Sequence, residues 1–314
     1  MPPVHTPLIL YVPGLLPKPE PALHKEALFR CLIAGVERQA PAVAASLLET
    51  KRSFDVIAWT FDFYREHRNI GLDRDAIEAV ITQAEATEDD IVEAASPTRR
   101  VLRSLYRMGN LFPFLIPHLA NERIQLHLRD LWRYAADRNG IAEHVREMLK
   151  VPLRAARASG RRILLIGHSM GSVIVYDSLW QLTHESRDAV EIDLLLTMGS
   201  PLGQNYVRRH ILGRDRQGAA RYPAGIRRWV NLTAVGDLTA IDPRLARDFA
   251  EMVALNLVPA IEDIEVFNYF RLHGELNVHA EYGYLANKVT ARLVADWWRA
   301  QAVQAEPTTA RDSV

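Results

Sequence analysis

Short apolar runs alternate with longer amphipathic stretches along this chain, and this alternation constrains its fold more than any other feature. Two of the runs, residues 162–166 and 192–198, are almost continuously apolar, as is typical of strands buried on both faces. Strands that alternate with helices predict a parallel sheet that is covered by helices on both faces and joined by right-handed crossovers. The predicted strands are residues 8–12, 54–59, 162–166, 192–198, 229–235 and 264–269.

The predicted helices form the layers on either side of this sheet. Within the second of them, Asn139-Gly140 predicts a break. The chain has 314 residues, of which 48% are apolar and 24% charged, and this ordinary composition excludes a fibrous or wholly disordered protein. We therefore expect a single α/β domain over residues 1–305 and a polar C-terminal tail over 306–314. The predicted helices are residues 21–50, 123–158, 171–185, 243–256 and 281–303.

About 100 residues separate the second predicted strand from the third, far more than one crossover helix needs. Residues 123–158 are sufficient for that crossover, so residues 62–122 are surplus to a simple alternation. We interpret this surplus stretch as a helical cap inserted over the edge of the sheet, not as an independent domain.

The cap carries a charged surface and an apolar surface. Arg99, Arg103 and Arg107 are spaced at i, i+4 and i+8, so a helix places them in one cationic stripe. The apolar run that follows, with Phe112 and Phe114, continues the other surface. Two interpretations stay open. The stripe is a solvated face over an apolar face packed on the core, or the cap is a lid that lines an acyl pocket and makes peripheral contact with an anionic membrane.

Charge and cysteine content exclude several classes of function. Lys plus Arg and Asp plus Glu each number 38, so no global field attracts the protein to nucleic acid. Cys31 is the single cysteine, which excludes an intrachain disulfide and a cysteine-based zinc site. No histidine pair has zinc-protease spacing, and we expect neither a metal nor any other cofactor. The N-terminus has no signal-peptide pattern and no apolar run reaches the roughly 18 residues of a membrane span, so we predict a cytoplasmic protein.

The strongest motif is Gly167-His-Ser-Met-Gly171, which directly follows the third predicted strand and precedes a helix. This is the G-x-S-x-G pattern of a nucleophile elbow, in its strand–turn–helix context. The tight turn strains the backbone of Ser169 and leaves no room for side chains two positions before and after it. The helix N-terminus places free N–H groups beside the serine oxygen. A chance match is expected only about 0.03 times in a chain of this composition.

A serine hydroxyl is a weak nucleophile until a base accepts its proton, and a third group must orient that base. On this type of sheet the acid and then the histidine follow the serine in chain order. Asp237 lies just beyond the strand that ends at residue 235, and it is the favoured acid. Asp242 is the alternative, although its place beside Pro243 favours a helix-capping role.

Two histidines follow the last predicted strand and are candidates for the base. His279 lies directly before the C-terminal helix, and we favour it. His273 lies in a Leu-His-Gly turn closer to the end of the strand and is the alternative.

An oxyanion hole needs two backbone N–H groups that point at the developing negative charge. Met170, the residue after the serine, is expected to supply one of them. The second is expected from the loop after the first strand, in which Pro13 has no N–H. Leu15 is therefore the favoured donor, with Gly14 as the alternative.

Four segments of the chain resemble the landmarks of lipase-like serine esterases of the α/β-hydrolase fold. They are Gly167–Gly171, Thr197–Gly203, Arg228–Leu232 together with Asp237, and His279–Tyr282. The resemblance covers roughly residues 8–60 and 160–300, and no segment of the cap contributes to it. It implies an α/β-hydrolase fold: a mostly parallel sheet of about six strands with helices on both faces and a helical cap insertion.

The resemblance also implies a chemistry. Ser169 is then the nucleophile, Asp237 the acid and His279 the base of a triad that cleaves a carboxylic ester through an acyl-enzyme. The expected substrate is an ester or a lipid-like small molecule. Thioester cleavage or acyl transfer by the same triad is one alternative, and a non-catalytic hydrolase-like binding protein is another.

Overall fold

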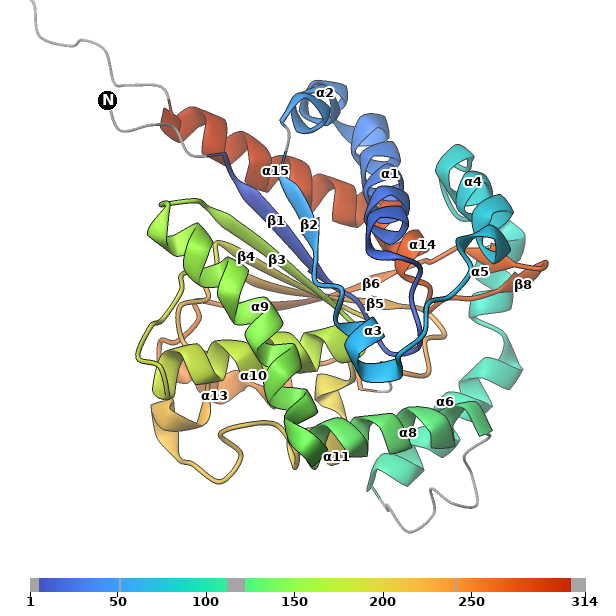
Figure 1. The fold of residues 1–314 in the computed structure, drawn as a ribbon. Helices are drawn as coiled ribbons and strands as arrows, with labels where there is room; N and C mark the ends of the chain where they lie inside the picture. The colour runs from blue at the N-terminus through green and yellow to red at the C-terminus, as the bar shows by residue number, and fades with distance from the viewer. Residues whose placement is uncertain (1–5, 51, 112–121, 241, 306–314) are drawn as a thin grey trace, which may run out of the picture.

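The computed structural model describes residues 6–50, 52–111, 122–240 and 242–305 (Figure 1). Its centre is a six-stranded sheet in the order β2-β1-β3-β4-β5-β6, in which every neighbouring pair of strands is parallel. This confirms the α/β class and the largely parallel sheet expected from the sequence. The strands are β1 Leu8–Val12, β2 Phe54–Val56, β3 Ile163–His168, β4 Leu194–Met198, β5 Trp229–Ala234 and β6 Ile261–Val266.

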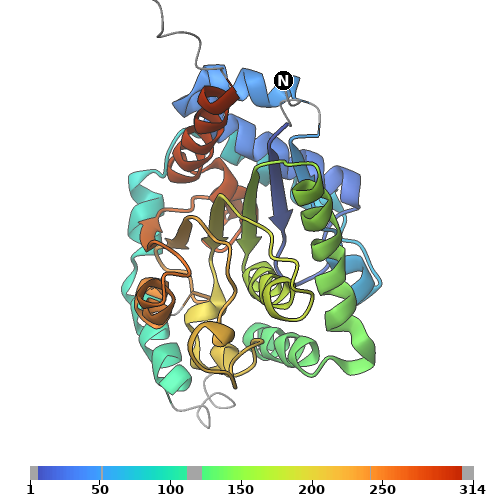
Figure 2. The same cartoon turned by 90° about the vertical axis from the view of Figure 1, so that its left-hand side faces the viewer.

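Helices cover both faces of this sheet, as Figures 1 and 2 show. One face is covered by α1 Pro21–Gln39, α2 Pro41–Glu49, α14 Glu281–Ala286 and α15 Lys288–Ala305. The opposite face is covered by α9 Ile141–Ala158, α10 Met170–His184, α12 Leu245–Asp248 and α13 Ala250–Ala254. The arrangement is three-layered, with the sheet in the middle.

Alternate side chains of the strands enter two separate cores, which explains why the strands are apolar without interruption. On β1, Ile9 and Tyr11 share a core with α1 and α14, whereas Leu10 and Val12 share a core with α9 and α10. All four side chains are at most 1% exposed. A one-residue slip of β1 would exchange the two sets of side chains, so the packing on both faces fixes the register.

Four of the five predicted helices are divided in the structure, including the one expected at 281–303, which is replaced by α14 and α15. The divisions of the first two have local causes. The first is divided by Pro41, which lacks an N–H to continue α1 and instead begins α2. The second is interrupted between α8 Glu122–Ala135 and α9, at the position where Asn139-Gly140 predicts a break. Asn139 and Gly140 both have positive φ there, which an α-helix does not accommodate.

Three other boundaries differ from the predicted ones. The strand expected at 54–59 ends at Val56, because Trp59 begins α3 Trp59–Tyr64 and its indole N–H donates to the Pro13 carbonyl at 2.9 Å. The strand expected at 264–269 begins earlier in the structure, because β6 runs from Ile261 to Val266 and pairs with β5 along the whole length of β5. The helix expected at 243–256 is replaced by α12 and α13, which are separated by a non-helical Phe249.

The surplus stretch 62–122 is largely helical and lies partly across the carboxyl ends of β5 and β6. It contains α4 Arg74–Thr82, α5 Glu88–Ala94 and α6 Pro97–Leu111, whereas α8 belongs to the crossover segment expected at 123–158. A Cβ placed on Gly236, just after β5, would lie 2.5 Å from the Ala94 carbonyl oxygen. Arg99 donates a hydrogen bond to the Leu276 carbonyl at 2.9 Å. The beginning of α6 is therefore held against the segments that follow β5 and β6.

Two of the three arginines of the expected stripe, Arg99 and Arg103, do not face solvent, and the side chain of Arg107 lies outside what the structure describes. The side chains of Arg99 and Arg103 are only 25% and 16% exposed. They lie 3.7 Å from Glu93 and 3.9 Å from Glu265, respectively. These two arginines face the edge of the sheet. Partial burial removes water from their guanidinium groups, and the nearby carboxylates offset the positive charge.

Three expectations fall on parts of the chain that lie outside the described residues. They concern Phe112, Phe114 and the expected polar tail 306–314. The acyl-pocket interpretation of the cap depended on the two phenylalanines. Within the part of the chain that the structure describes, no helix has both the length and the apolar character needed to cross a membrane.

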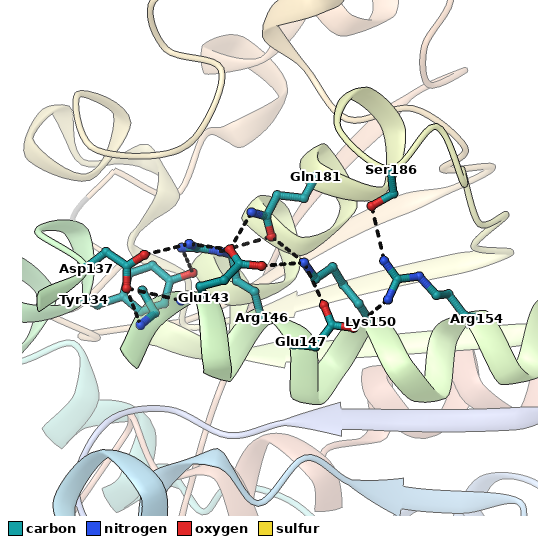
Figure 3. Close-up of polar contacts among 10 residues, drawn as sticks. Tyr134, Asp137, Glu143, Arg146, Glu147, Lys150, Arg154, Gln181 and Ser186 are labelled. Carbon is teal, nitrogen blue, oxygen red and sulfur yellow. Dashed lines mark hydrogen bonds and ion pairs between the residues drawn. The ribbon is translucent and has the colours of Figure 1, made fainter. Parts of the chain in front are cut away.

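A polar network fastens α9 to α10 (Figure 3). Glu143 lies at its centre and accepts hydrogen bonds from Arg146 at 2.9 Å, Lys150 at 2.8 Å and Gln181 at 2.7 Å. Lys150 also donates to the Gln181 side chain at 3.0 Å. Because α10 begins directly after Ser169, this α9–α10 network fixes the direction of the helix behind the serine turn.

Candidate active site

Ser169 occupies the turn between β3 and α10 with φ 51° and ψ −125°. A non-glycine residue rarely adopts a positive φ, and such strain costs about 1–3 kcal/mol. Two glycines make the turn sterically allowed. A Cβ on Gly171 would overlap the Val12 carbonyl oxygen, and a Cβ on Gly167 would lie 2.7 Å from the Cα of Ser172. The surrounding structure therefore imposes the strained conformation on Ser169.

Hydrogen bonds from neighbouring segments hold the strained turn. The Ser169 N–H donates to the Met198 carbonyl, at the end of β4, at 2.8 Å. Ser172 donates from Oγ to the Ser169 carbonyl at 2.6 Å, and its hydroxyl also lies 2.7 Å from the Ser200 hydroxyl. Ser169 is thereby fixed at the carboxyl edge of the sheet, where parallel sheets place their ligand sites.

Asp237 and His279 lie together beyond the ends of β5 and β6. His279 donates from Nδ1 to Oδ2 of Asp237 at 2.8 Å. Asp237 is fully buried and also accepts hydrogen bonds from the Tyr284 hydroxyl at 2.9 Å and the Thr239 N–H at 2.8 Å. Burial alone would raise the pKa of Asp237, but the His279 ring and these donors hold its pKa below the usual range. The ionised carboxylate fixes the tautomer that leaves Nε2 of His279 without a proton.

The segment after β4 brings this pair toward the serine turn. Gly199 has a φ of 56°, and a Cβ there would lie 2.9 Å from Asp237 Oδ2 and 2.9 Å from the His279 ring. Its neighbour Met198 accepts the hydrogen bond of the Ser169 N–H. Residues 198 and 199 thus contact all three of the residues predicted to form a triad. Only glycine fits at position 199.

His168 connects the serine turn to His279. Its Nε2 donates to the His279 carbonyl at 2.9 Å, and the two ring centroids are 4.8 Å apart. Burial and the neighbouring His279 ring lower the pKa of His168 to about 3, so this ring is neutral. Within the described residues, no hydrogen bond joins the Ser169 hydroxyl directly to His279. Catalytic contacts of this kind are often loose without substrate and tighten in the substrate complex.

The alternative acid and base lie elsewhere. Asp242 is bonded to Arg247 at 2.6 Å and to Arg244 at 3.3 Å, before α12. His273 lies at the exposed turn of a small hairpin formed by β7 Arg271–Leu272 and β8 Glu275–Leu276. The structure therefore brings Asp237 and His279 together, and neither alternative joins them.

The loop after β1 lies against the serine. A Cβ on Gly14 would lie 2.8 Å from the Cβ of Ser169 and 3.3 Å from its Oγ. Two aromatic side chains of α3 hold this loop. The Trp59 indole donates to the Pro13 carbonyl, and the Tyr64 hydroxyl accepts from the Leu16 N–H at 3.2 Å.

Among the described residues, both predicted oxyanion donors lack a hydrogen-bond acceptor. Neither the Leu15 N–H nor the Met170 N–H donates to a partner among the residues that the structure describes. Met170 is the first residue of α10, so its N–H has no acceptor within the helix. Gly14 stays as the alternative to Leu15, since it belongs to the same loop.

A buried carboxylate supports the candidate site from behind, and the sequence analysis did not identify it. Glu281, at the start of α14, accepts hydrogen bonds from Tyr11 at 3.1 Å and His24 at 3.0 Å and pairs with Lys18 at 3.0 Å. Burial alone would raise the pKa of Glu281, but Lys18 and His24 hold it well below the usual range. We call these four residues the Glu281 cluster. The only sequence signal for it was the position of Glu281 two residues after His279.

The arrangement offers a strained serine, an imidazole oriented by a buried carboxylate, and unpaired N–H donors. Across the described ranges, no group of three or more His, Cys, Asp or Glu side chains could hold a metal ion. Comparison of the chain with protein-family models, with curated proteins and with solved structures found no match.

Proposed function

We propose that the protein is a serine hydrolase of the α/β-hydrolase fold that cleaves a carboxylic ester. One observation carries the proposal. The strained Ser169, the Asp237–His279 pair and a loop with an unpaired N–H converge at the carboxyl edge of one parallel sheet. The order serine, acid, histidine along the chain supports the same fold family.

In the first half of the reaction, Nε2 of His279 accepts the proton of Ser169 as Oγ attacks the ester carbonyl carbon. Asp237 stabilises the imidazolium that forms. The former carbonyl oxygen becomes an oxyanion, which the N–H groups of Met170 and Leu15 stabilise. His279 then protonates the departing alcohol oxygen, and Ser169 is left acylated.

In the second half, water attacks the acyl carbon while His279 accepts a proton from it. Return of that proton to Ser169 Oγ breaks the acyl bond and releases the carboxylic acid. His168 holds the backbone of His279 through this sequence. It does not compete for the proton, because its pKa lies near 3.

Intact-mass measurement after fluorophosphonate treatment tests the nucleophile. We expect one adduct on the wild type and none on Ser169→Ala. Hydrolysis of p-nitrophenyl acetate and butyrate by that variant should fall by about 10³-fold or more. An adduct on the variant, or labelling of a different serine in the wild type, would overturn the assignment.

Ser178→Ala is the matched control for this experiment. Ser178 lies on the same helix, is fully buried, and its hydroxyl has no hydrogen-bond partner among the described residues. Its removal should leave both labelling and hydrolysis at the wild-type level. A folded wild type that neither forms an adduct nor hydrolyses esters would instead favour the non-catalytic binding protein.

A further inference from the structure

A second hollow lies beside α10, separate from the candidate active site. It is a cavity of about 320 Å³ between α10, α11 Asn205–Arg208, the loop after α11, and the α12–α13 segment. Tyr176, one of its lining residues, follows Ser169 by seven positions in α10. At 1.5 Å per residue, this places the cavity about 10 Å along the helix from the serine. None of Ser169, Asp237 and His279 lines it.

The cavity lining is strongly cationic. Arg208, Arg209, Arg214 and Arg221 line it, and Asp248 is the one carboxylate among the lining residues. The lining therefore carries four positive charges and one negative charge, a surplus of three.

The existing ion pairs leave most of this positive charge uncompensated. Oδ1 of Asp248 is already shared between Arg208 at 3.1 Å and Arg247 at 2.7 Å. Arg214 pairs at 3.4 Å with Asp215, which is 81% exposed and contributes little in water. Arg209 and Arg221 form no ion pair with a carboxylate of the described residues, and both are solvent-exposed. Guanidinium groups gathered in this way repel one another unless an anion binds between them.

The scaffold that presents these arginines is pinned to α10. The Leu212 N–H donates to Asp177 at 2.8 Å, and the Trp180 indole donates to the Ala220 carbonyl at 3.0 Å. The floor is aromatic: the ring of Phe249 lies 5.6 Å from that of Tyr176 and 6.4 Å from that of Tyr222, measured between centroids. A rigid presentation lowers the entropy lost when a ligand binds.

We propose that this cavity binds a phosphate monoester of a small organic molecule, with the phosphoryl group among the arginines and the organic part over the aromatic floor. The planar donor fork of arginine matches the oxygens of phosphate in paired hydrogen bonds. A ligand with one carboxylate would neutralise only one of the three surplus positive charges, whereas a phosphate monoester dianion neutralises two. The volume lies at the lower end of the roughly 300–1,000 Å³ of small-molecule sites. The proposal does not depend on hydrolase activity at Ser169.

Calorimetric titration of the full chain with inorganic phosphate, with adenosine monophosphate and with adenosine tests this site. We expect the monophosphate to bind more tightly than inorganic phosphate and adenosine not to bind. Added NaCl should weaken binding, because it screens the arginine field. Ser169→Ala should bind like the wild type, which separates this site from the proposed catalysis.

The double substitution Arg209→Gln with Arg221→Gln should weaken phosphate binding by about tenfold or more, since each arginine supplies charge-assisted hydrogen bonds. Arg216→Gln is the matched control, because Arg216 belongs to the same loop and is exposed but does not line the cavity. Equal affinities of the double variant and the wild type would overturn the proposal, and so would the absence of binding to every phosphate probe.

Sedimentation with phosphatidylcholine vesicles, with and without phosphatidic acid, distinguishes a soluble phosphate ester from a lipid headgroup. A soluble ligand predicts binding to adenosine monophosphate without binding to either vesicle. Binding only to vesicles with phosphatidic acid, lost in the double variant, would assign the same phosphate chemistry to a headgroup. Vesicle binding that the double variant retains would belong to another surface and, without binding of soluble phosphates, would overturn the site.

Discussion

The Glu281 cluster and the α9–α10 network both bury charged side chains, but their carboxylates differ in solvent exposure. The side chain of Glu281 is 6% exposed and that of its partner His24 is 2% exposed. In the α9–α10 network, Lys150 is equally buried at 5%, yet its partners Glu143 and Glu147 are 46% and 44% exposed. The carboxylate of the Glu281 cluster has lost almost all contact with water, whereas the carboxylates of the α9–α10 network remain in contact with water.

This difference indicates what each cluster is for. A charge that loses all its water is costly to bury, and proteins concentrate such groups where chemistry or precise positioning requires them. The Glu281 cluster lies 3.9 Å from Nδ1 of His168, whose Nε2 donates to the carbonyl of His279, the residue to which we assign proton transfer. The α9–α10 network lies along the flank of two helices, where half-exposed carboxylates fasten one helix to another at little cost.

The largest expected effect comes from the side of the molecule that we assign to chemistry. His279→Ala should lower kcat for p-nitrophenyl butyrate by about 10³–10⁶-fold, the range for loss of a triad member. The fully buried Asp237 also loses its partner, so the variant should unfold at a lower temperature as well. Steady-state kinetics with a thermal melt on the same preparation measure both quantities.

His273→Ala is the control for this substitution, because His273 lies at an exposed hairpin turn. It should retain nearly full activity. If His273→Ala proved to be the inactive variant, the base would have been assigned to the wrong histidine, and the Glu281 cluster would lose its connection to proton transfer.

Glu281→Gln should have the next largest effect, on stability. It leaves Lys18 without its counter-charge, and breaking a buried ion pair in this way costs about 3–5 kcal/mol. Urea unfolding at neutral pH measures the loss. Lys150→Met is the comparison: its two carboxylate partners are nearly half-exposed and regain water, so we expect a loss of about 1 kcal/mol or less. Equal losses in the two variants would remove the distinction between the clusters.

The smallest expected effect is a change in how stability depends on pH. One buried group near each cluster has a shifted pKa, and the two groups change the free energy of unfolding in opposite directions as the pH changes. Burial raises the pKa of Asp177 on α10 to about 6, although the Leu212 N–H and Arg146 oppose the rise. An unfolded aspartate has a pKa near 4, so between about pH 4 and 6 only the folded protein holds this proton. Stability from Asp177 therefore decreases as the pH rises through that window. His168, whose folded pKa is about 3, is the reverse: acidification below about pH 6.5 protonates only the unfolded chain and lowers stability.

Asp177→Asn removes one of these opposing contributions. The free energy of unfolding should then fall more steeply between pH 6 and pH 4, by up to about 1.4 kcal/mol per pH unit. Urea titrations at pH 4, 5, 6 and 7 give the slope. Parallel curves for the variant and the wild type would show that Asp177 titrates normally in the folded protein.

The parts of the fold that could be predicted from sequence are those with local causes. Apolar runs buried on both faces identify strands because alternate side chains meet two cores, as Ile9 and Leu10 do. The serine turn is equally local, since Gly167 and Gly171 leave the space that the turn requires. Chain order on a parallel sheet then directs attention to Asp237 and His279.

The parts that sequence did not reveal depend on partners far along the chain. His24 and Tyr11 reach Glu281 across 257 and 270 positions, and no spacing rule connects residues so far apart. The spacing of Arg99 and Arg103 predicted one helical face correctly but not its surroundings, because Leu276 and Glu265 lie on elements that fold in from the C-terminal part of the chain.

The composition of β6 affects how copies of this protein meet one another. β6 ends the sheet, so one row of its backbone groups has no neighbouring strand within the sheet. Such a row is a template for aggregation when it is apolar. Here Glu262, Asp263 and Glu265 interrupt it. Glu262 pairs with Arg228 at 2.8 Å, and Asp263 accepts from the N–H groups of Leu245 and Ala246, so polar side chains and α12 occupy this border. At the other end, β2 offers only three residues. The open sheet thus resists fibril-like stacking because charged side chains interrupt one border and the other border is short.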